Sequence, residues 1–414
     1  MSTPTKESDS YVTYFKELSA KLSETLTFRH YKIEISNWEY GALVSRCLVK
    51  IIDNPHGDLN AVDIAAGLTF ELGKDFGGKV RVIKVSNNII YLEMPNCPSV
   101  RKLIYLKDAL QSPEYKENEA RIPILIGEKI GGEPIVVDLY HMSHLLIGGR
   151  IGAGKSVWVN SMIFSLISRY SPADVRFVMI DPTVMELQVY NNIPHMLAPI
   201  IHDLNKTVRA LDWLVNEMEN RFQKFKEQNV INIWGFNKKI KNGEIAGESL
   251  PIIVCIIDEL ADLMMINPRK IEILLVRLAQ LGKSAGIHLI VATNRPTHDV
   301  LSELMISNFP SRIAFKVDSQ EKSRLILNFP DAEYLVGWGD MLCLMPTDLS
   351  DTPVRALSYF ISDEDVDILV SNISRDSEPK YNEQLLDALK KKAGKSSSFT
   401  IMQIMQEVAN KYEK

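Results

Sequence analysis

The 414-residue sequence contains no apolar run that could cross a membrane. No uninterrupted apolar stretch approaches the roughly 18 residues that a spanning helix needs. The N-terminus, MSTPTKESDS, is polar and has no apolar segment like that of a signal peptide. These two absences argue against membrane spans and against secretion. We therefore expect a cytoplasmic protein without direct membrane insertion.

Cysteine is scarce, and positive charge is not in excess. The four cysteines, Cys47, Cys97, Cys255 and Cys343, stand far apart and form no C-x-x-C pair. This spacing suggests neither a disulfide framework nor a zinc site. The net charge of −5 and the pI near 6.0 exclude a wholly basic nucleic-acid binder, which leaves only local basic patches for such a role.

Apolar residues make up 46% of the chain, which is enough for a sizeable core, and the length is typical of two or three domains. Composition divides the chain into four parts. We predict a disordered N-terminus over residues 1–10, a small α+β domain over 11–118, a larger domain over 119–373 and a polar tail with short helices over 374–414. The small domain mixes a helical pattern with strands such as VRVIKV and IIYLEMP.

In the larger domain, apolar strands alternate with helical patterns. Near-continuous apolar runs separated by helices are typical of a parallel sheet that is buried on both faces. We therefore predict an α/β fold with a mainly parallel sheet. The predicted strands are HLLIGG, VRFVMID, PIIVCIIDE, GIHLIVATN and SRIAFKV.

A phosphate-binding loop follows the first of these strands. The spacing of Gly149, Gly154, Lys155 and Ser156 matches G-x-x-x-x-G-K-[ST], with an apolar strand before it and a helical pattern after it. The glycines of such a loop let successive N–H groups point at phosphate oxygens, beside the positive end of a helix. The predicted nucleotide-binding residues are Gly149, Arg150, Ile151, Gly152, Ala153, Gly154, Lys155, Ser156 and Val157.

Two side chains of this loop have predicted chemical roles. Lys155 is expected to reach the β- and γ-phosphates, and Ser156 to ligate Mg²⁺. The predicted cofactors are therefore ATP and Mg²⁺. The alternative is a chance match in an ordinary glycine turn, and the strand and helix on either side of the loop argue against it.

Two adjacent carboxylates follow another buried strand. Asp258 and Glu259 come directly after the apolar run from Ile252 to Ile257, and strand ends are where ligands bind in open α/β sheets. We predict that Asp258 holds Mg²⁺ and that Glu259 orients the water that attacks the γ-phosphate. The alternative is that both acids only start the next helix, where carboxylates interact favourably with the helix dipole.

A third strand, within HLIVATNRP, ends in Thr293 and Asn294. A polar side chain at this edge could sense the γ-phosphate through a hydrogen bond. The alternative is that these residues only cap the turn that precedes Pro296.

Several segments resemble, in order and with similar spacing, the motor of the FtsK/SpoIIIE family of double-stranded DNA translocases. The resemblance covers about residues 75 to 370, and DPTVMEL and DELADLMM are more specific than the phosphate loop alone. The other matching segments are EPIVVDLYHMSHLLIGG, GAGKSVWVNSMIFSL, RLAQLGKSAGIHLIVATNRP, SRIAFKV and GWGDMLCLMP.

The resemblance implies a RecA-like P-loop ATPase core, preceded by a smaller α+β domain. It also implies a homo-hexameric ring around double-stranded DNA that hydrolyses ATP to move along it. By matched position, Asn294 is the expected sensor. The matching segments include neither the family's membrane spans nor its winged-helix DNA reader, and the sequence does not indicate a recruiting protein.

The sequence departs from the family pattern at three positions. Asn294 stands where the family usually has Gln, Thr183 where it has Lys, and Lys283 where it has Arg. In the family that arginine reaches the nucleotide of the neighbouring subunit. We expect Lys283 to take this role, with Arg277, Arg295 and Arg312 as alternatives.

Because the chain is acidic overall, DNA contacts must be concentrated in a few places. By the resemblance, two loops face the pore of the ring, and their basic residues are Arg269, Lys270, Lys322 and Arg324. The alternative is that these four are solvated surface charges. For the whole chain, the alternatives to a DNA translocase are a related ring ATPase that moves a protein or protein-bound nucleic acid, and a nucleotide-gated scaffold, which the presence of Glu259 argues against.

Overall fold

The computed structural model describes residues 13–14, 16–20, 22–24, 32–53, 80–86, 89–346 and 352–391. The predicted disordered segment over residues 1–10 and the end of the predicted polar tail lie outside these residues.

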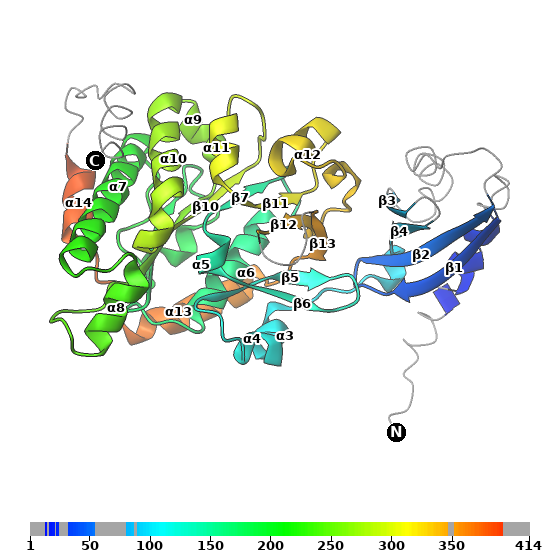
Figure 1. Ribbon diagram of the computed structural model, residues 1–414, viewed down its shortest axis with the longest axis horizontal. Coiled ribbons are helices and arrows are strands. Elements are labelled where there is room, and N and C mark those ends of the chain that lie inside the picture. The colour runs from blue at the N-terminus through cyan, green and yellow to red at the C-terminus, as the bar shows by residue number, and fades with distance from the viewer. Residues whose placement is uncertain are drawn as a thin grey trace.

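A small antiparallel sheet lies at one end of the molecule (Figure 1). Within the described residues it has the strand order β1-β2-β4-β3. Its core is a cluster of buried apolar side chains that includes Leu18 and Leu22 of the N-terminal helical segment and Leu92 of β4. The predicted α+β fold of this part of the chain is confirmed. The strands are Lys32–Glu39 (β1), Val44–Asp53 (β2), Arg81–Ser86 (β3) and Ile89–Pro95 (β4).

The larger sheet contains a parallel block of five strands in the order β11-β7-β10-β9-β8. These are the five strands predicted from the apolar runs, and their carboxyl ends meet at one edge. We call this the carboxyl edge, and the opposite one the amino edge. The strands are Ser311–Phe315 (β11), Leu145–Gly148 (β7), Ile287–Thr293 (β10), Ile252–Ile257 (β9) and Val175–Ile180 (β8).

An antiparallel extension continues this sheet beyond β11, so that the full order among the described residues is β6-β5-β13-β12-β11-β7-β10-β9-β8. The sheet is therefore mixed, whereas the apolar runs predicted only its parallel part. The added strands are Pro134–Asp138 (β6), Pro123–Lys129 (β5), Val354–Leu357 (β13) and Asp340–Leu344 (β12).

Helices cover both faces of the large sheet (Figure 1). Helices α7 and α10 pack together on one face, and α6 packs on the other. The α-helices are Leu106–Gln111 (α3), Pro113–Lys116 (α4), Leu139–Met142 (α5), Lys155–Ile167 (α6), Leu204–Glu227 (α7), Ile233–Lys241 (α8), Leu260–Met264 (α9), Pro268–Ala285 (α10), Glu303–Asn308 (α11), Gln320–Leu327 (α12), Asp363–Asp376 (α13) and Glu383–Lys390 (α14). Short 3₁₀ turns span Pro98–Val100 (η1), Gln188–Asn192 (η2) and Ala332–Tyr334 (η3).

Local sequence signals set the ends of the long helix α10. Asn267 caps its first turn by accepting a hydrogen bond from the Lys270 N–H, and Pro268 occupies its first position. Gly286 ends it with φ 73°, a left-handed conformation that glycine adopts without strain. The chain then enters β10 at once.

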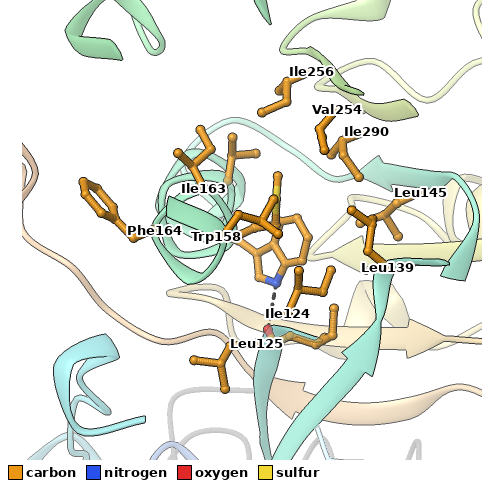
Figure 2. Packing of buried hydrophobic residues seen from close by; sticks show 14 of the residues in the cluster. Ile124, Leu125, Leu139, Leu145, Trp158, Ile163, Phe164, Val254, Ile256 and Ile290 are labelled. Atoms are coloured by element: carbon orange, nitrogen blue, oxygen red, sulfur yellow. Dashed lines mark hydrogen bonds between the residues drawn. The ribbon is translucent and has the colours of Figure 1, made fainter. Parts of the chain in front are cut away.

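Alternating side chains of the parallel strands fill two separate cores. In β7, Leu145 and Ile147 face the α6 side, whereas Leu146 faces the α7 and α10 side. Trp158 of α6 is fully buried in the first core, and its indole N–H donates to the Ile126 carbonyl oxygen at 2.7 Å (Figure 2). Truncating a buried tryptophan to alanine typically costs about 3–5 kcal/mol, and the hydrogen bond satisfies the only polar group of this side chain.

Three short helices pack with the large sheet rather than apart from it. Leu106 of α3 and Tyr115 of α4 lie in the core on the α6 side, and Leu385 of α14 lies in the core beside α7. The domain boundaries at residues 118 and 373 stay predictions, and this packing favours grouping α3, α4 and α14 with the larger unit. Across the described ranges, no helix has the length and apolar character of a membrane span.

Candidate nucleotide site

The phosphate loop joins β7 to α6 at the carboxyl edge, and its glycines are required by their surroundings. Gly152 and Gly154 have φ angles of 73° and 110°, which disfavour residues with a side chain. A Cβ on Gly149 would lie 2.7 Å from the Cβ of Phe315, so only glycine fits between the loop and β11. The loop backbone is thus bent in the way that phosphate binding requires.

Lys155 is held inside the bend of its own loop. Its Nζ donates to the carbonyl oxygens of Gly149 at 2.7 Å and Arg150 at 2.8 Å, and its side chain is nearly buried. Burial lowers the pKa of Lys155 to about 8, although nearby Glu259 and Asp258 act to raise it. Phosphate oxygens would be stronger acceptors for this ammonium than the two carbonyls.

Asp258 lies beside a second acid. Strands β8 and β9 pair in register up to Ile180 and Ile257, so that Asp181 and Asp258 follow at neighbouring positions. Burial, together with the charges of Asp181, Glu186 and Glu259, raises the pKa of Asp258 to about 7, and Lys155 acts to lower it. A bound cation at this position would favour the ionised form of Asp258.

Glu259 is fixed by three hydrogen bonds. Its Oε1 accepts from the Ala261 N–H at 3.0 Å and the Thr293 hydroxyl at 2.8 Å, and its Oε2 accepts from the Asn294 N–H at 2.9 Å. Glu259 is thus the N-cap of α9, as the alternative interpretation of these acids required. A carboxylate offers about four acceptor positions, so one remains on Oε2 for a water molecule. Its role in hydrolysis stays a prediction.

The end of β10 contributes through Thr293 as well as through Asn294. From this end of the strand, Glu259 accepts one hydrogen bond from the Thr293 side chain and one from the Asn294 backbone, and Asn294 is half-buried. Whether Asn294 senses the γ-phosphate stays a prediction.

Asp181 is a further acid of the site and was not among the predicted site residues. It is fully buried, and its carboxylate accepts hydrogen bonds from Thr183, Val184, Glu186 and Leu187. These bonds fold the DPTVMEL segment into a loop beside Asp258. The signal was present, because Asp181 ends the predicted strand VRFVMID as Asp258 ends its own.

The residues fit a magnesium ion that is held mostly by its ligand and by water. Among the described residues, no group of three or more His, Cys, Asp or Glu side chains could hold a metal ion alone. Mg²⁺ is commonly bound by one or two protein oxygens together with phosphates and waters. The Ser156 hydroxyl at the start of α6 and the Asp258 carboxylate are oxygen donors of this kind.

The four predicted DNA contacts lie after the carboxyl ends of two strands. Arg269 and Lys270 start α10, and Lys322 and Arg324 lie in α12. Lys270 pairs with Asp212 at 2.7 Å and Lys322 pairs with Asp318 at 3.1 Å, whereas Arg269 and Arg324 are exposed. Exposed pairs of this kind are weak, so they do not prevent contact with phosphates.

Lys283 lies at the amino edge, opposite the phosphate loop. It is in the last turn of α10, just before β10 begins, whereas Thr293 ends that strand at the nucleotide edge. Its ammonium lies 4.8 Å from the centre of the Tyr140 ring. Lys283 is therefore remote from the phosphate loop of its own chain.

A phosphate loop after a buried strand, facing carboxylates at the ends of neighbouring parallel strands, defines the fold class of the P-loop ATPases. The comparison with known proteins then identifies the family. The sequence model of the FtsK/SpoIIIE family matches residues 105–298. The chain belongs to the FtsK/SpoIIIE family, and the resemblance predicted from its motifs is confirmed.

Relatives in two bacteria illustrate the similarity. The chain is 40% identical over 342 residues to "DNA translocase FtsK" of Pseudomonas aeruginosa, with 77% of this chain and 42% of that protein covered. It is 45% identical over 302 residues to "DNA translocase FtsK" of Clostridium tetani, with 72% and 40% covered. The chain thus spans about two fifths of the length of these relatives.

Two solved structures have a similar fold. The pCW3 conjugation coupling protein TcpA, solved in its monomer form with ATPγS, has a TM-score of 0.59 at 20% identity, with 85% of this chain and 96% of that chain covered. The cytoplasmic domain of the Thermomonospora curvata Type VII secretion ATPase EccC has a TM-score of 0.56 at 21% identity, with 71% and 36% covered. At these identities the likeness concerns the fold.

Proposed function

We propose that this chain is an ATP-driven motor that moves along double-stranded DNA as a ring of identical subunits. The observation that carries the proposal is that Lys155, Asp258 and Glu259 come together at one edge of the sheet. Glu259 and Asp258 act to raise the pKa of Lys155, and Lys155 acts to lower the pKa of Asp258. The identity of about 40% to proteins named DNA translocase supports DNA as the partner. We propose the cytoplasm as its compartment.

In the proposed reaction the chain positions ATP and stabilises the charge of the transferred phosphoryl group. The loop amides and Lys155 bind the phosphates, because Lys155 exchanges the carbonyls of Gly149 and Arg150 for phosphate oxygens. Ser156 and Asp258 would hold Mg²⁺, which neutralises phosphate charge when bound.

Glu259 orients the attacking water with its remaining acceptor position. The bonds from Ala261, Thr293 and Asn294 fix the carboxylate, so it does not need to reorganise during the reaction. Thr293 acts through Glu259 as a positioning residue.

The proposed ring places DNA contacts on Arg269, Lys270, Lys322 and Arg324 and a trans-acting cation on Lys283. Contacts from these basic residues to phosphates position a duplex without reading its sequence. The overall charge of −5 makes such concentrated contacts necessary.

The test is the ATPase rate of the full chain with and without duplex DNA, at about 50 mM and about 200 mM salt. We expect DNA to stimulate hydrolysis at the lower salt concentration and to lose most of this effect at the higher one. Changing the four basic residues to Glu should remove stimulation and leave the basal rate nearly unchanged. A rate that DNA does not change under any condition would contradict DNA as the partner and favour a ring ATPase that moves a protein.

A further inference from the structure

The turn before β12 contains a tryptophan in an unusual backbone conformation. Gly337, Trp338 and Gly339 have φ angles of 97°, 57° and 89°, so three consecutive residues are left-handed. Glycine adopts such angles freely, but a bulky residue does so only under strain. The Trp338 side chain is also 79% exposed, so it contributes little to the core. Folding alone explains neither feature.

The surrounding structure holds this turn in place. The Asp340 carboxylate accepts a hydrogen bond from the Val336 N–H at 2.7 Å, which closes the turn. Arg355 of β13 fixes that carboxylate through two further bonds, at 2.6 and 3.0 Å. The strained position of Trp338 is therefore imposed by buried neighbours.

The turn lies directly on the phosphate loop. The Gly339 N–H donates to the Ala153 carbonyl oxygen at 3.0 Å. A Cβ on Gly154 would lie 2.7 Å from the Gly339 nitrogen and 3.7 Å from the Trp338 carbonyl carbon. The backbone of Trp338 is thus next to the residue that starts α6.

Sheet order puts Trp338 and the acids on opposite sides of the loop. Trp338 precedes β12, and β12 and β11 lie on one side of β7. Asp258 and Glu259 follow β9, which lies on the other side beyond β10. A triphosphate whose terminal phosphate faces the acids would extend across the loop, and its nucleoside would emerge toward the turn.

We propose that Trp338 stacks on the base of the bound nucleotide. This inference rests on the proposed function, since it assumes that the loop binds a nucleoside triphosphate. An indole face stacks on any base, so the contact distinguishes nucleotides from inorganic phosphates and discriminates little between adenine and guanine. The left-handed turn holds the indole beside the loop before the nucleotide arrives.

The test compares ATP with inorganic tripolyphosphate, which has the same three phosphates and no base. Binding of each ligand with Mg²⁺ to the full chain is measured by calorimetry for the parent, Trp338→Ala and Trp338→Phe. Stacking on an aromatic side chain is typically worth about 5- to 150-fold in affinity. We expect Trp338→Ala to weaken ATP binding by about that factor and to leave tripolyphosphate binding unchanged, and Trp338→Phe to retain most of the ATP affinity.

Ile231→Ala is the matched control. Ile231 is 86% exposed and lies between α7 and α8. Ile231 lies near the amino edge. Arg221, near the end of α7, donates to the carbonyl oxygens of Pro251 and Ala285, and these two residues lie just before β9 and β10. This variant should bind both ligands like the parent.

Three results would overturn this inference alone. Equal ATP affinity in Trp338→Ala and the parent would mean that the indole does not contact the base. Equal weakening of ATP and tripolyphosphate would mean that the substitution distorts the phosphate loop instead. If the parent bound tripolyphosphate and ATP equally tightly, no base contact would exist. Failure of the parent to bind either ligand would instead overturn the proposed nucleotide site, and the inference with it.

Discussion

Two buried groups of charged residues in this molecule differ in the direction in which the protein shifts their pKa values. One is the nucleotide site around Lys155, Asp258 and Glu259. The other, which we call the junction network, consists of Arg81, Glu93, Asp340 and Arg355, and connects the small sheet with the large one. Both groups contain nearly buried ionisable side chains of both signs, but only in the junction network does each charge have a close partner of opposite sign.

In the junction network each charge has close partners. Arg355 lies between the two carboxylates, 3.1 Å from Glu93 and 2.6 Å from Asp340. Arg81 lies 3.1 Å from Glu93 and 3.0 Å from Asp331. Burial would raise the pKa of Glu93, but Arg81 and Arg355 hold it below its ordinary value. Burial would likewise lower the pKa of Arg355, but Asp340 and Glu93 raise it.

In the nucleotide site the pKa shifts have the opposite direction. Burial lowers the pKa of Lys155 to about 8 and raises that of Asp258 to about 7, so both groups are displaced toward their neutral forms. The two clusters differ in whether the chain itself completes the pairing. We infer that the junction network holds the two sheets together, whereas the nucleotide site is completed by charges that a ligand brings.

The largest expected effect comes from removing Lys155 from the phosphate loop. Lys155→Ala should reduce ATP affinity about 100-fold or more, because it removes the ammonium that the loop holds and that is expected to bind the phosphates. Glu259→Gln should keep ATP affinity within a few-fold of the parent and reduce turnover at least 100-fold, because it spares the phosphate loop and removes the carboxylate that orients water. Calorimetry and a steady-state ATPase assay measure the two properties separately.

The roles assigned to these residues require that Lys155→Ala loses ATP affinity and that Glu259→Gln loses turnover. A Glu259→Gln variant that hydrolysed ATP at the parental rate would show that Glu259 is only the cap of α9. Circular dichroism should show that both variants fold, since Gln can still accept the bonds from Ala261 and Thr293 through one oxygen.

The second prediction breaks the junction network. Arg355→Met should lower the free energy of unfolding by about 3–5 kcal/mol, because it leaves Glu93 and Asp340 buried beside each other without their shared cation. Urea denaturation followed by circular dichroism measures this loss. Lys390→Met is the control, because it removes a lysine from an exposed pair with Asp387 and should change stability very little. Equal stability of Arg355→Met and the parent would contradict a structural role for the network.

The third prediction uses pH to separate the two clusters. The pKa of Glu93 is lower in the folded chain than its ordinary value of 4.5, so its charge stabilises the fold above that pH and stops doing so as pH falls. Glu93→Gln should therefore be destabilising at pH 7, and its difference from the parent should shrink between about pH 4.5 and lower values.

Asp258→Asn should show the opposite dependence. The pKa of Asp258 is raised from 3.8 to about 7, so ionising it destabilises the folded chain increasingly as pH rises from 4 to above 7. The variant should gain stability over the parent across that range, by up to about 4 kcal/mol at pH 8 without Mg²⁺ or nucleotide. Urea titrations at several pH values test both predicted directions. If the stability of the two variants relative to the parent changed with pH in the same direction, the distinction between the two clusters would be wrong.

The sequence was sufficient to predict the parallel block of the sheet and the phosphate loop. Both depend on contiguous signals, namely apolar runs and the spacing of glycines, lysine and serine. The antiparallel extension was missed. Strands β6 and β13 are only partly buried, and β5 and β12 were not recognised although they are mostly buried and at least as long as β7 and β11, respectively. Asp181 could have been found, since it ends a predicted strand in the same way as Asp258.

The junction network could not be predicted from local patterns. Glu93 and Arg355 are separated by 262 positions along the chain and become neighbours only when β4 and β13 approach each other. The positioning role of Thr293 was equally hidden, because sequence alone did not show which residue at the end of β10 would turn its side chain to Glu259. Such contacts depend on tertiary packing, which periodicity and motifs do not encode.

The smallest expected effect concerns Lys283, at the edge of the sheet opposite the nucleotide. If it completes the site of a neighbouring subunit, Lys283→Ala should lower the ATPase rate about 2- to 10-fold at ring-forming concentration without changing ATP affinity, because its own loop is remote. The expected factor is small because an ammonium lacks the two-pronged contact of arginine, and Lys283→Arg should accordingly raise the rate.

The contact between Lys283 and the Tyr140 ring offers a competing explanation, since it stabilises the subunit by about 0.5–1 kcal/mol and removing it could reduce activity through stability alone. Tyr140→Leu removes the same contact, together with the contacts of the ring to Arg121 and Trp234, and keeps the cation. It should therefore lose at least as much stability as Lys283→Ala and leave the rate unchanged. If Lys283→Ala is silent, the role passes to Arg277, Arg295 or Arg312. Arg312 is the least available of the three, because its guanidinium already donates to the Phe309 and Ile306 carbonyls, whereas Arg277 and Arg295 form half-exposed pairs with Glu219 and Asp299. A rate loss confined to Arg277→Ala or Arg295→Ala would therefore move the trans-acting cation from Lys283 to that arginine.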